Sequence, residues 1–372
     1  MAVHEIRIDR SKTLVEEPST GHNRWHPDIP PVVRCEPGDE VVLETRDAFD
    51  GQMHRDATLE TVGAPNLDVV HPLTGPVHVA GAEPGDLLEV EILEVVPDSY
   101  GYTVQVPGFG FLRDVFPEPF MVRWDIADGF ATSDDLPGIR VPGAPFMGTI
   151  GLSPGHELLR RITAREQASL DAGGAVLPPS PASAVPSDPA IAAEALRTIP
   201  PREQAGNVDI KQLSAGTRLF LPVDTPGALF SAGDAHFAQG DSETCGTAIE
   251  MTATLRVRFT VHSGAARERG INDPEFTRSE YWVAPEYAAP RRFYATTGMS
   301  IDGDGVLHSE NATLAARNAL LNMISHLGRR GFNRQQAYAI CSVAVDLKIS
   351  QLVDVPSFLV SAFLPEDIFT TP

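Results

Sequence analysis

Ionisable side chains gather between residues 233 and 243, where the chain reads Gly-Asp-Ala-His-Phe-Ala-Gln-Gly-Asp-Ser-Glu. In an extended chain, residues two apart point to the same face, so Asp234 and His236 are expected to lie side by side. Asp241 and Glu243 repeat this spacing. A carboxylate next to an imidazole can bind a divalent metal or act in general acid–base chemistry. The alternative is a solvated loop with a Gly-Asp turn at each end.

Strand patterns flank this segment. An apolar run covers 219–223, and apolar and polar residues alternate without a break from Met251 to Val261. The alternation predicts a long strand with one buried face. Glu250 is in phase with the polar face of that strand, so its simplest interpretation is an exposed carboxylate at the strand start.

Polar residues of two other segments are candidates for the same site. Asn207, Asp209 and Lys211 alternate with apolar residues, so all three are expected on one strand face. Asp47 follows a predicted strand over 41–46, and an acidic residue at a strand end is well placed to line a cleft. By pattern alone, a polar strand face and a turn residue explain these positions at least as well.

Separated segments from residue 22 to the C-terminus resemble the acetamidase/formamidase family, whose members hydrolyse short aliphatic amides. The central segment matches Gly-Asp-x-His-x-x-Gln-Gly-Asp-x-Glu followed by Cys-Gly-Thr-Ala-Ile-Glu. Ser242 is a departure, because the family usually has a glycine at that position. The other matching segments are 22–32, 47–52, 71–76, 207–211 and 336–365, and the first and last resemble the long, formamidase-like branch.

The resemblance implies an amidohydrolase that cleaves the C–N bond of formamide or acetamide to a carboxylate and ammonia. It supports the positions of the site residues, and their roles are hypotheses from amide chemistry. We expect catalytic Glu243, Asp234 and His236; substrate-binding Asn207, Asp209 and Gln239; and metal-binding Asp47, Asp234 and His236. The metal would be divalent, with zinc favoured and no organic cofactor, since such an ion activates water and polarises a carbonyl. Glu243 would serve as the general base.

Three alternatives stay open. Cys245, with a glutamate and a lysine nearby, offers a second route to amide hydrolysis through a thiolate nucleophile. The same site also fits a larger formamide or a urea-like substrate. Finally, it fits a small molecule or metal that is bound without turnover.

His71 begins a proline-clamped loop, where it either lines the site or has a structural role.

Composition restricts the fold class. The 372 residues include 31 glycines and 32 prolines, which require many turns and favour a β-rich structure. We predict an α+β fold that is mainly β, with two β-rich lobes, Pro-Gly turns and C-terminal helices. The predicted division is a β-rich domain over 1–170, a Pro/Ala/Ser-rich linker over 171–206 and an α+β domain over 207–372. The alternative is an excursion within one fused β structure.

The C-terminal helices have recognisable ends. Asn311, or a neighbour, is predicted to cap a helix that reaches Leu327, because apolar residues recur on one side of that stretch. Asn333 with Gln336 three residues later predicts a capping box for a second helix.

Net charge indicates which partners to expect, and cysteine content indicates the cellular compartment. A net charge of −21 would repel nucleic acid and anionic membrane, so a small-molecule amide is the expected partner. The sequence shows no apolar signal core or membrane-spanning run, and its three cysteines lie far apart, which favours a cytoplasmic protein. The apolar residues at 358–364 suit a subunit contact, so a homo-oligomer is expected.

Overall fold

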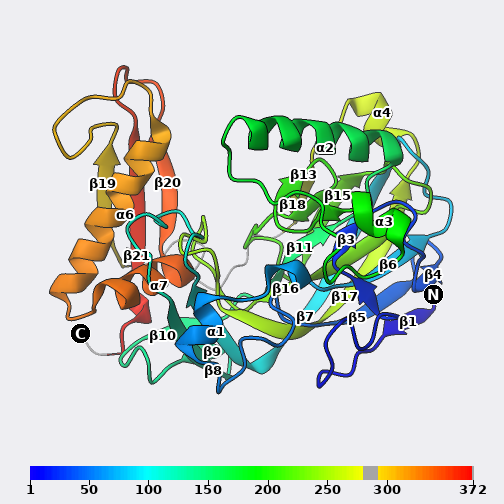
Figure 1. Cartoon of the computed structure of the whole chain (residues 1–372), viewed down its shortest axis with the longest axis horizontal. Coiled ribbons are helices and arrows are strands. Elements are labelled where there is room, and N and C mark those ends of the chain that lie inside the picture. Colours follow the sequence, from blue (N-terminus) through cyan, green and yellow to red (C-terminus); the bar gives the residue numbers. More distant parts are fainter. Residues whose placement is uncertain (280–291, 371–372) are drawn as a thin grey trace.

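The computed structural model describes residues 1–279 and 292–370. These residues form two lobes, which lie side by side in Figure 1. One lobe is built on a sheet of 16 strands, and the other on a sheet of three strands with helices packed against it. This mixed α+β architecture, rich in strands and with helices near the C-terminus, confirms the predicted fold class.

The large sheet follows the order β10-β9-β8-β7-β17-β16-β11-β14-β13, and the other strands pair beside this path. Its members are β1 (Val3–Ile6), β2 (Gly21–His22), β4 (Val33–Cys35), β5 (Glu40–Thr45), β6 (Leu73–Val79), β7 (Leu87–Gln105), β8 (Phe120–Ala127), β9 (Phe130–Thr132), β10 (Arg140–Pro142), β11 (Phe146–Gly151), β13 (Pro201–Arg202), β14 (Ala205–Asn207), β15 (Thr217–Pro222), β16 (Phe230–His236), β17 (Glu250–His262) and β18 (Glu275–Arg278).

Strand β17 is the long half-buried strand that the alternation predicts. It pairs antiparallel with β5, β7 and β16. Leu255, Val257 and Phe259 on its apolar face are fully buried. The Pro-Gly turns that lead into β5 and β7 are also confirmed, since Gly38 and Gly85 have φ of 90° and 96°, which glycine adopts without strain.

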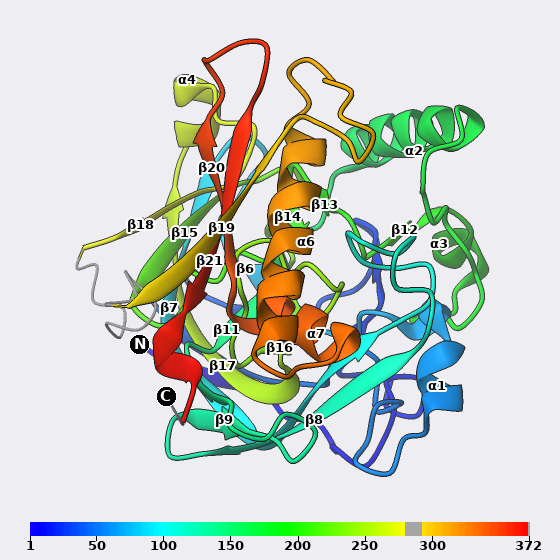
Figure 2. The ribbon, with the colours of Figure 1, turned by 90° about the vertical axis from the view of Figure 1, so that its left-hand side faces the viewer.

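The smaller lobe contains β19 (Phe293–Met299), β20 (Asp346–Gln351) and β21 (Leu359–Pro365), in the order β19-β21-β20. Helix α6 (Ala312–Arg329) lies along this sheet, as Figure 2 shows, and α7 (Arg334–Ala344) follows it. The side chain of Asn311 caps α6, and the predicted capping box of Asn333 and Gln336 opens α7. Both predicted helix starts are therefore confirmed.

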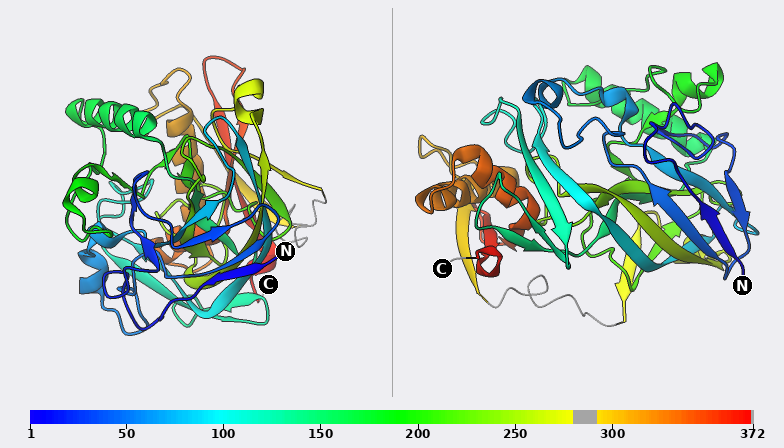
Figure 3. Two further views of the ribbon diagram at one scale, coloured as in Figure 1. Left: turned by 90° about the vertical axis from the view of Figure 1, so that its right-hand side faces the viewer. Right: turned by 90° about the horizontal axis from the view of Figure 1, so that it is seen from below.

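The remaining described elements are helices and one separate strand pair. They are α1 (Leu59–Gly63), α2 (His156–Asp171), α3 (Pro189–Glu194), α4 (Ala265–Arg269), the 3-10 helices η1 (Leu67–Val69) and η2 (Glu366–Ile368), and the strand pair β3 (Arg24–Trp25) with β12 (Leu196–Arg197). Helices α2 and α3 lie in the same part of the larger lobe (Figure 1), and the two termini lie at opposite ends of the molecule (Figure 3).

The division of the chain at 171–206 stays a prediction. Strands from both sides of that segment pair within one sheet, as β7 does with β17 and β11 with β16. The segment itself includes α3, β12 and β13. Across 1–279 and 292–370, no helix is both long and apolar enough to cross a membrane.

Candidate active site

The ionisable segment ends strand β16 and meets the start of β17. His236 is the direct cross-strand partner of Glu250. The Nε2 atom of His236 lies 3.4 Å from Oδ1 of Asp234 and 3.1 Å from Oε2 of Glu250. Asp234 has a φ of 56°, so the backbone is distorted rather than regularly extended at this point. The predicted neighbourhood of Asp234 and His236 is nevertheless present.

The expectation that Glu250 is exposed is wrong. Its side chain is buried, with 2% exposure, and its Oε1 accepts a hydrogen bond from the backbone N–H of Ala248 at 2.9 Å. The alternation correctly places Glu250 on the polar face of β17. At this end of the strand that face turns to a buried group of ionisable side chains instead of solvent.

Two further carboxylates reach His236 from loops. One donor atom from each of Asp209, His236 and Glu243 lies within 4.8 Å of the other two. The Oε1 atom of Glu243 is 3.9 Å from Nε2 of His236. Asp209 and Glu243 have φ of 47° and 44°, and Ser242 has a φ of 93°. The left-handed backbone at Ser242 gives a physical reason for the glycine that the family usually carries there.

The predicted shared strand face of Asn207, Asp209 and Lys211 is wrong. Strand β14 ends at Asn207, and the positive φ of Asp209 turns the chain. As a result Asn207 and Asp209 reach the site, whereas the ammonium of Lys211 pairs with Asp346 and lies 3.8 Å from Asp241. Two carboxylates, those of Asp346 and Asp241, therefore lie beside the ammonium of Lys211.

Strand β11 contributes two residues that the sequence patterns did not identify. A Cβ at Gly148 would stand 2.6 Å from Cε1 of His236, 2.7 Å from Oδ1 of Asp209 and 2.8 Å from Oδ2 of Asp234. The hydroxyl of Thr149 donates to Oδ1 of Asn207 at 2.6 Å. No periodicity distinguishes these two positions, because their importance depends on the strand opposite.

Gln239 orients the imidazole. Its Oε1 lies 3.0 Å from Nδ1 of His236, and its Nε2 donates to the backbone carbonyl of Asp209 at 2.8 Å. An amide oxygen can only accept, so Nδ1 carries a proton and Nε2 faces the carboxylates. Gln239 is 1% exposed and is absent from the cavity wall, so the structure places it behind His236.

The site is a coupled set of charges. Burial raises the pKa of Glu243 well above its usual range, and the nearby Asp209 carboxylate adds to this. Burial also raises the pKa of Asp209 and of Glu250 to about 7. Burial opposes ionisation of Asp234, but His71 and His236 outweigh it and lower its pKa. At His236 burial is outweighed by Glu250 and Asp234, which raise its pKa.

A cavity of about 90 Å³ opens onto Asp234, Glu243 and Glu250 of this set. One water needs about 10–15 Å³ by this kind of measure, so a molecule of several non-hydrogen atoms has room. Its wall combines a few polar side chains with mainly apolar ones. Its lining is Ala48, Phe49, Leu67, Val70, His71, Val104, Val106, Phe109, Ile199, Asn207, Asp234, Glu243, Cys245, Gly246, Thr247 and Glu250.

Two residues left open by the sequence line this cavity. His71 has its Nε2 at 3.9 Å from Oδ2 of Asp234, and burial lowers its pKa. Cys245 is buried, and burial raises the pKa of its thiol. Its Sγ lies 3.6 Å from the carbonyl oxygen of Val104 and 3.5 Å from that of Thr247. These surroundings disfavour a thiolate, because carbonyl oxygens repel negative charge.

Asp47 lies outside this group. Its Oδ1 accepts from the hydroxyl of Tyr102 at 2.6 Å and from the backbone N–H of Phe49 at 3.0 Å. Its Oδ2 accepts from the N–H of Gly51 at 2.8 Å. The structure therefore gives this carboxylate the surroundings of a turn residue, and it does not bring Asp47 together with Asp234 and His236.

The residues around His236 fit a divalent metal. Nε2 of His236, Oε2 of Glu250 and Oδ1 of Asp209 are buried without a hydrogen-bond partner. Asp234, His236 and Glu250 offer three donor atoms within 4.8 Å of one another, as do Asp209, His236 and Glu243. One imidazole nitrogen with carboxylate oxygens suits zinc and related ions.

Known proteins share both the sequence and the fold. Residues 7–371 match the Acetamidase/Formamidase family. The chain is 36% identical to a formamidase of Methylophilus methylotrophus, over 98% of this chain and 93% of that protein. It is also 36% identical to an acetamidase of Mycolicibacterium smegmatis, over 90% of this chain and 87% of that protein.

Among solved structures, a gamma lactamase from Delftia acidovorans superimposes with a TM-score of 0.94 at 36% identity, covering 99% of this chain and 94% of that one. The family match spans nearly the whole chain and includes the buried cluster around His236. This protein therefore belongs to the acetamidase/formamidase family of hydrolases that act on amide C–N bonds.

Proposed function

We propose that this protein hydrolyses short aliphatic amides, such as formamide and acetamide, to a carboxylate and ammonia. The observation that carries the proposal is a small, mainly apolar cavity whose wall includes Asp234, Glu243 and Glu250, carboxylates that are grouped around His236. An amide of a few atoms can place its C–N bond beside these carboxylates and its alkyl group against the apolar side chains. The names of the formamidase and acetamidase relatives support the same substrate class.

In this proposal Asn207 binds the substrate carbonyl. Its Oδ1 already accepts a hydrogen bond from the hydroxyl of Thr149, so its NH₂ group remains as a hydrogen-bond donor at the cavity wall. A donor aimed at the carbonyl oxygen stabilises the negative charge that develops there. The apolar wall, including Phe49 and Val104, limits the access of bulk water and strengthens this interaction.

Glu243 serves as general base and then as general acid. It takes a proton from the attacking water and returns a proton to the leaving nitrogen. Burial holds its pKa above the usual range, which favours the return of the proton to the leaving nitrogen. Since the base must be ionised, activity is expected to fall as the pH drops through this raised pKa.

Asp234, His236 and Glu250 would hold a divalent cation, for which we favour zinc, and Gln239 keeps Nε2 of His236 directed at it. Such an ion, when bound, supplies a Lewis acid for the carbonyl and for water. Metal analysis of active protein tests this proposal. Full activity in metal-free protein would refute it.

The central test is ammonia release from formamide, acetamide and propionamide. Glu243→Gln keeps the shape of the side chain but cannot accept the proton, so kcat is expected to fall by roughly 10²–10⁴-fold. The matched control is Glu268→Gln on the exposed side of α4, which should hydrolyse normally. Near-normal turnover by Glu243→Gln would remove the assigned base.

A second candidate substrate is a bulkier or cyclic amide. Phe109 and Ile199 line both the cavity and an adjoining, mainly apolar hollow of about 390 Å³. A longer acyl chain could pass between these two side chains. The name of the gamma lactamase relative also favours a cyclic amide. Phe109→Ala should then raise kcat/KM for hexanamide or 2-pyrrolidinone relative to acetamide. An unchanged ratio would restrict the enzyme to short amides.

We also propose that copies of the chain associate. Ile349, Val353 and Val355 are 63%, 78% and 65% exposed at the smaller lobe, close in sequence to the apolar stretch at 358–364. Exposed apolar groups of this kind mark contact surfaces. Sedimentation of the purified protein as a monomer would contradict this.

A further inference from the structure

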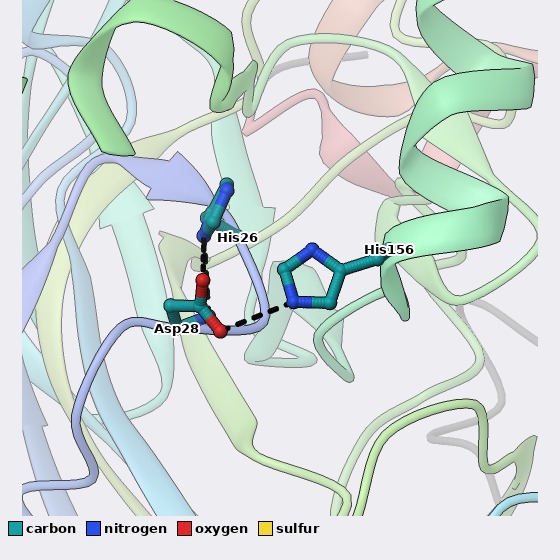
Figure 4. A group of neighbouring side chains, drawn as sticks. All are labelled: His26, Asp28 and His156. Atoms are coloured by element: carbon teal, nitrogen blue, oxygen red, sulfur yellow. Dashed lines mark hydrogen bonds and ion pairs between the residues drawn. The ribbon is translucent and has the colours of Figure 1, made fainter. Parts of the chain in front are cut away.

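We propose that His26, Asp28 and His156 form a second metal site, which binds zinc or a similar divalent ion and is separate from the amide site. His26 and Asp28 follow strand β3, and His156 is the first residue of α2. Figure 4 shows the three side chains directed toward one another. One donor atom from each lies within 4.8 Å of the other two.

The distances are close to those of a coordination shell. Nε2 of His156 is 3.2 Å from Oδ1 of Asp28, and Nδ1 of His26 is 3.9 Å from Oδ2 of Asp28. Tetrahedral zinc with bonds of about 2.0–2.2 Å holds neighbouring donor atoms roughly 3.4 Å apart. The side chains of Asp28 and His156 are 58% and 53% exposed, so they are free to make the small adjustment and leave a position for water.

Glu194 prepares His26 as a ligand. Nε2 of His26 lies 2.9 Å from Oε1 of Glu194, while Nδ1 accepts the backbone N–H of Asp28 at 3.1 Å. Both contacts require the proton on Nε2 and the lone pair on Nδ1, which faces Asp28. A carboxylate behind a metal-binding histidine fixes its tautomer and increases its basicity. Coordination would replace the hydrogen bond from the backbone N–H of Asp28 and the direct contact between Asp28 and His156.

Electrostatics permit a cation here. The positive end of α2 disfavours one, but the carboxylates of Asp28 and Glu194 offset it. The net charge of −21 also attracts cations. None of His26, Asp28 and His156 lines the amide cavity. A metal at this site would join the 26–28 loop to α2 directly and to α3 through Glu194, so it should stabilise the fold.

Zinc titration of the full-length protein by calorimetry, together with melting temperature with and without zinc, tests the proposal. His156→Ala and Asp28→Asn should each bind one equivalent of zinc fewer than the unmodified protein and lose part of the zinc-dependent rise in melting temperature. Amide hydrolysis should be unchanged in both. His308→Ala is the matched control, because His308 is also exposed and paired, with Asp302 at 2.7 Å, and it should behave as the unmodified protein.

Glu194→Gln adds a readout that a simple surface ion pair would not produce. All three ligands remain, so the stoichiometry should hold while the zinc affinity of this site falls about 10–100-fold. The proposal is overturned if His156→Ala binds as much zinc, with the same gain in melting temperature, as the unmodified protein and His308→Ala.

Discussion

Gly148→Ala tests whether close packing across β11 positions the proposed catalytic cluster of Asp209, Asp234 and His236. The structure leaves no space for the added methyl group, which would meet His236, Asp209 and Asp234 at 2.6–2.8 Å. Ordinary contacts of this kind lie at 3.4–4 Å, so all three neighbours, or the β11 backbone itself, must move by about 0.6–0.8 Å. His236 cannot yield easily, because Gln239 holds its Nδ1 in a hydrogen bond.

The expected effect on activity is large. A misplacement near 1 Å can cost about 10²-fold in rate, which corresponds to about 2.7 kcal/mol of transition-state stabilisation. Overpacking also destabilises a fold by about 1–3 kcal/mol. Kinetics of ammonia release from acetamide and urea unfolding measure the two effects separately.

Gly328→Ala provides the control. It lies in α6 with no atom within 4 Å of the added Cβ, so activity should persist and stability should be unchanged or slightly increased. Full activity in Gly148→Ala would refute the packing argument. A loss explained wholly by unfolding at the assay temperature would also count against a positional role.

Three other substitutions test the site. Cys245→Ala should keep near-normal kcat/KM for acetamide, because the buried thiol is disfavoured as a nucleophile; loss of turnover in folded protein would revive the thiolate route. Asp47→Ala should leave the metal content unchanged and lower the free energy of unfolding by about 1–3 kcal/mol for each group left unpaired, the Tyr102 hydroxyl among them. The opposite pattern, with metal lost and stability kept, would establish Asp47 as a ligand. Ser242→Gly should raise the urea concentration at the midpoint of unfolding, since glycine tolerates a φ of 93°. The corresponding gain in the free energy of unfolding is up to about 1 kcal/mol. A lower midpoint would show that the serine side chain stabilises this turn.

Features encoded by neighbouring residues were predictable from the sequence. The alternation of 251–261 identified strand β17, and the spacing of Asn333 and Gln336 identified the start of α7. Each depends on periodicity or on a hydrogen bond within one turn, so it needs no knowledge of distant segments. The central segment with Asp234, His236 and Glu243 was also recognised locally, but from the density of its ionisable groups.

Other site residues could not be assigned from local pattern. Glu250 looked like an exposed carboxylate, yet it is the buried cross-strand partner of His236. Gln239 carried the expectation of substrate binding, yet it lies behind the imidazole. Gly148 gave no signal, although it leaves the space that the cluster occupies.

The sequence by itself determined the strand-rich fold class, the ends of the C-terminal helices and the central acidic and histidine residues, because local chain geometry governs each of these. Only the tertiary structure decided which carboxylates meet His236. That choice depends on the register of β11, β16 and β17 and on left-handed backbone at Asp209 and Glu243. Alternation shows which residues share a face, but the pairing of strands far apart in the chain decides whether that face meets solvent or a buried site.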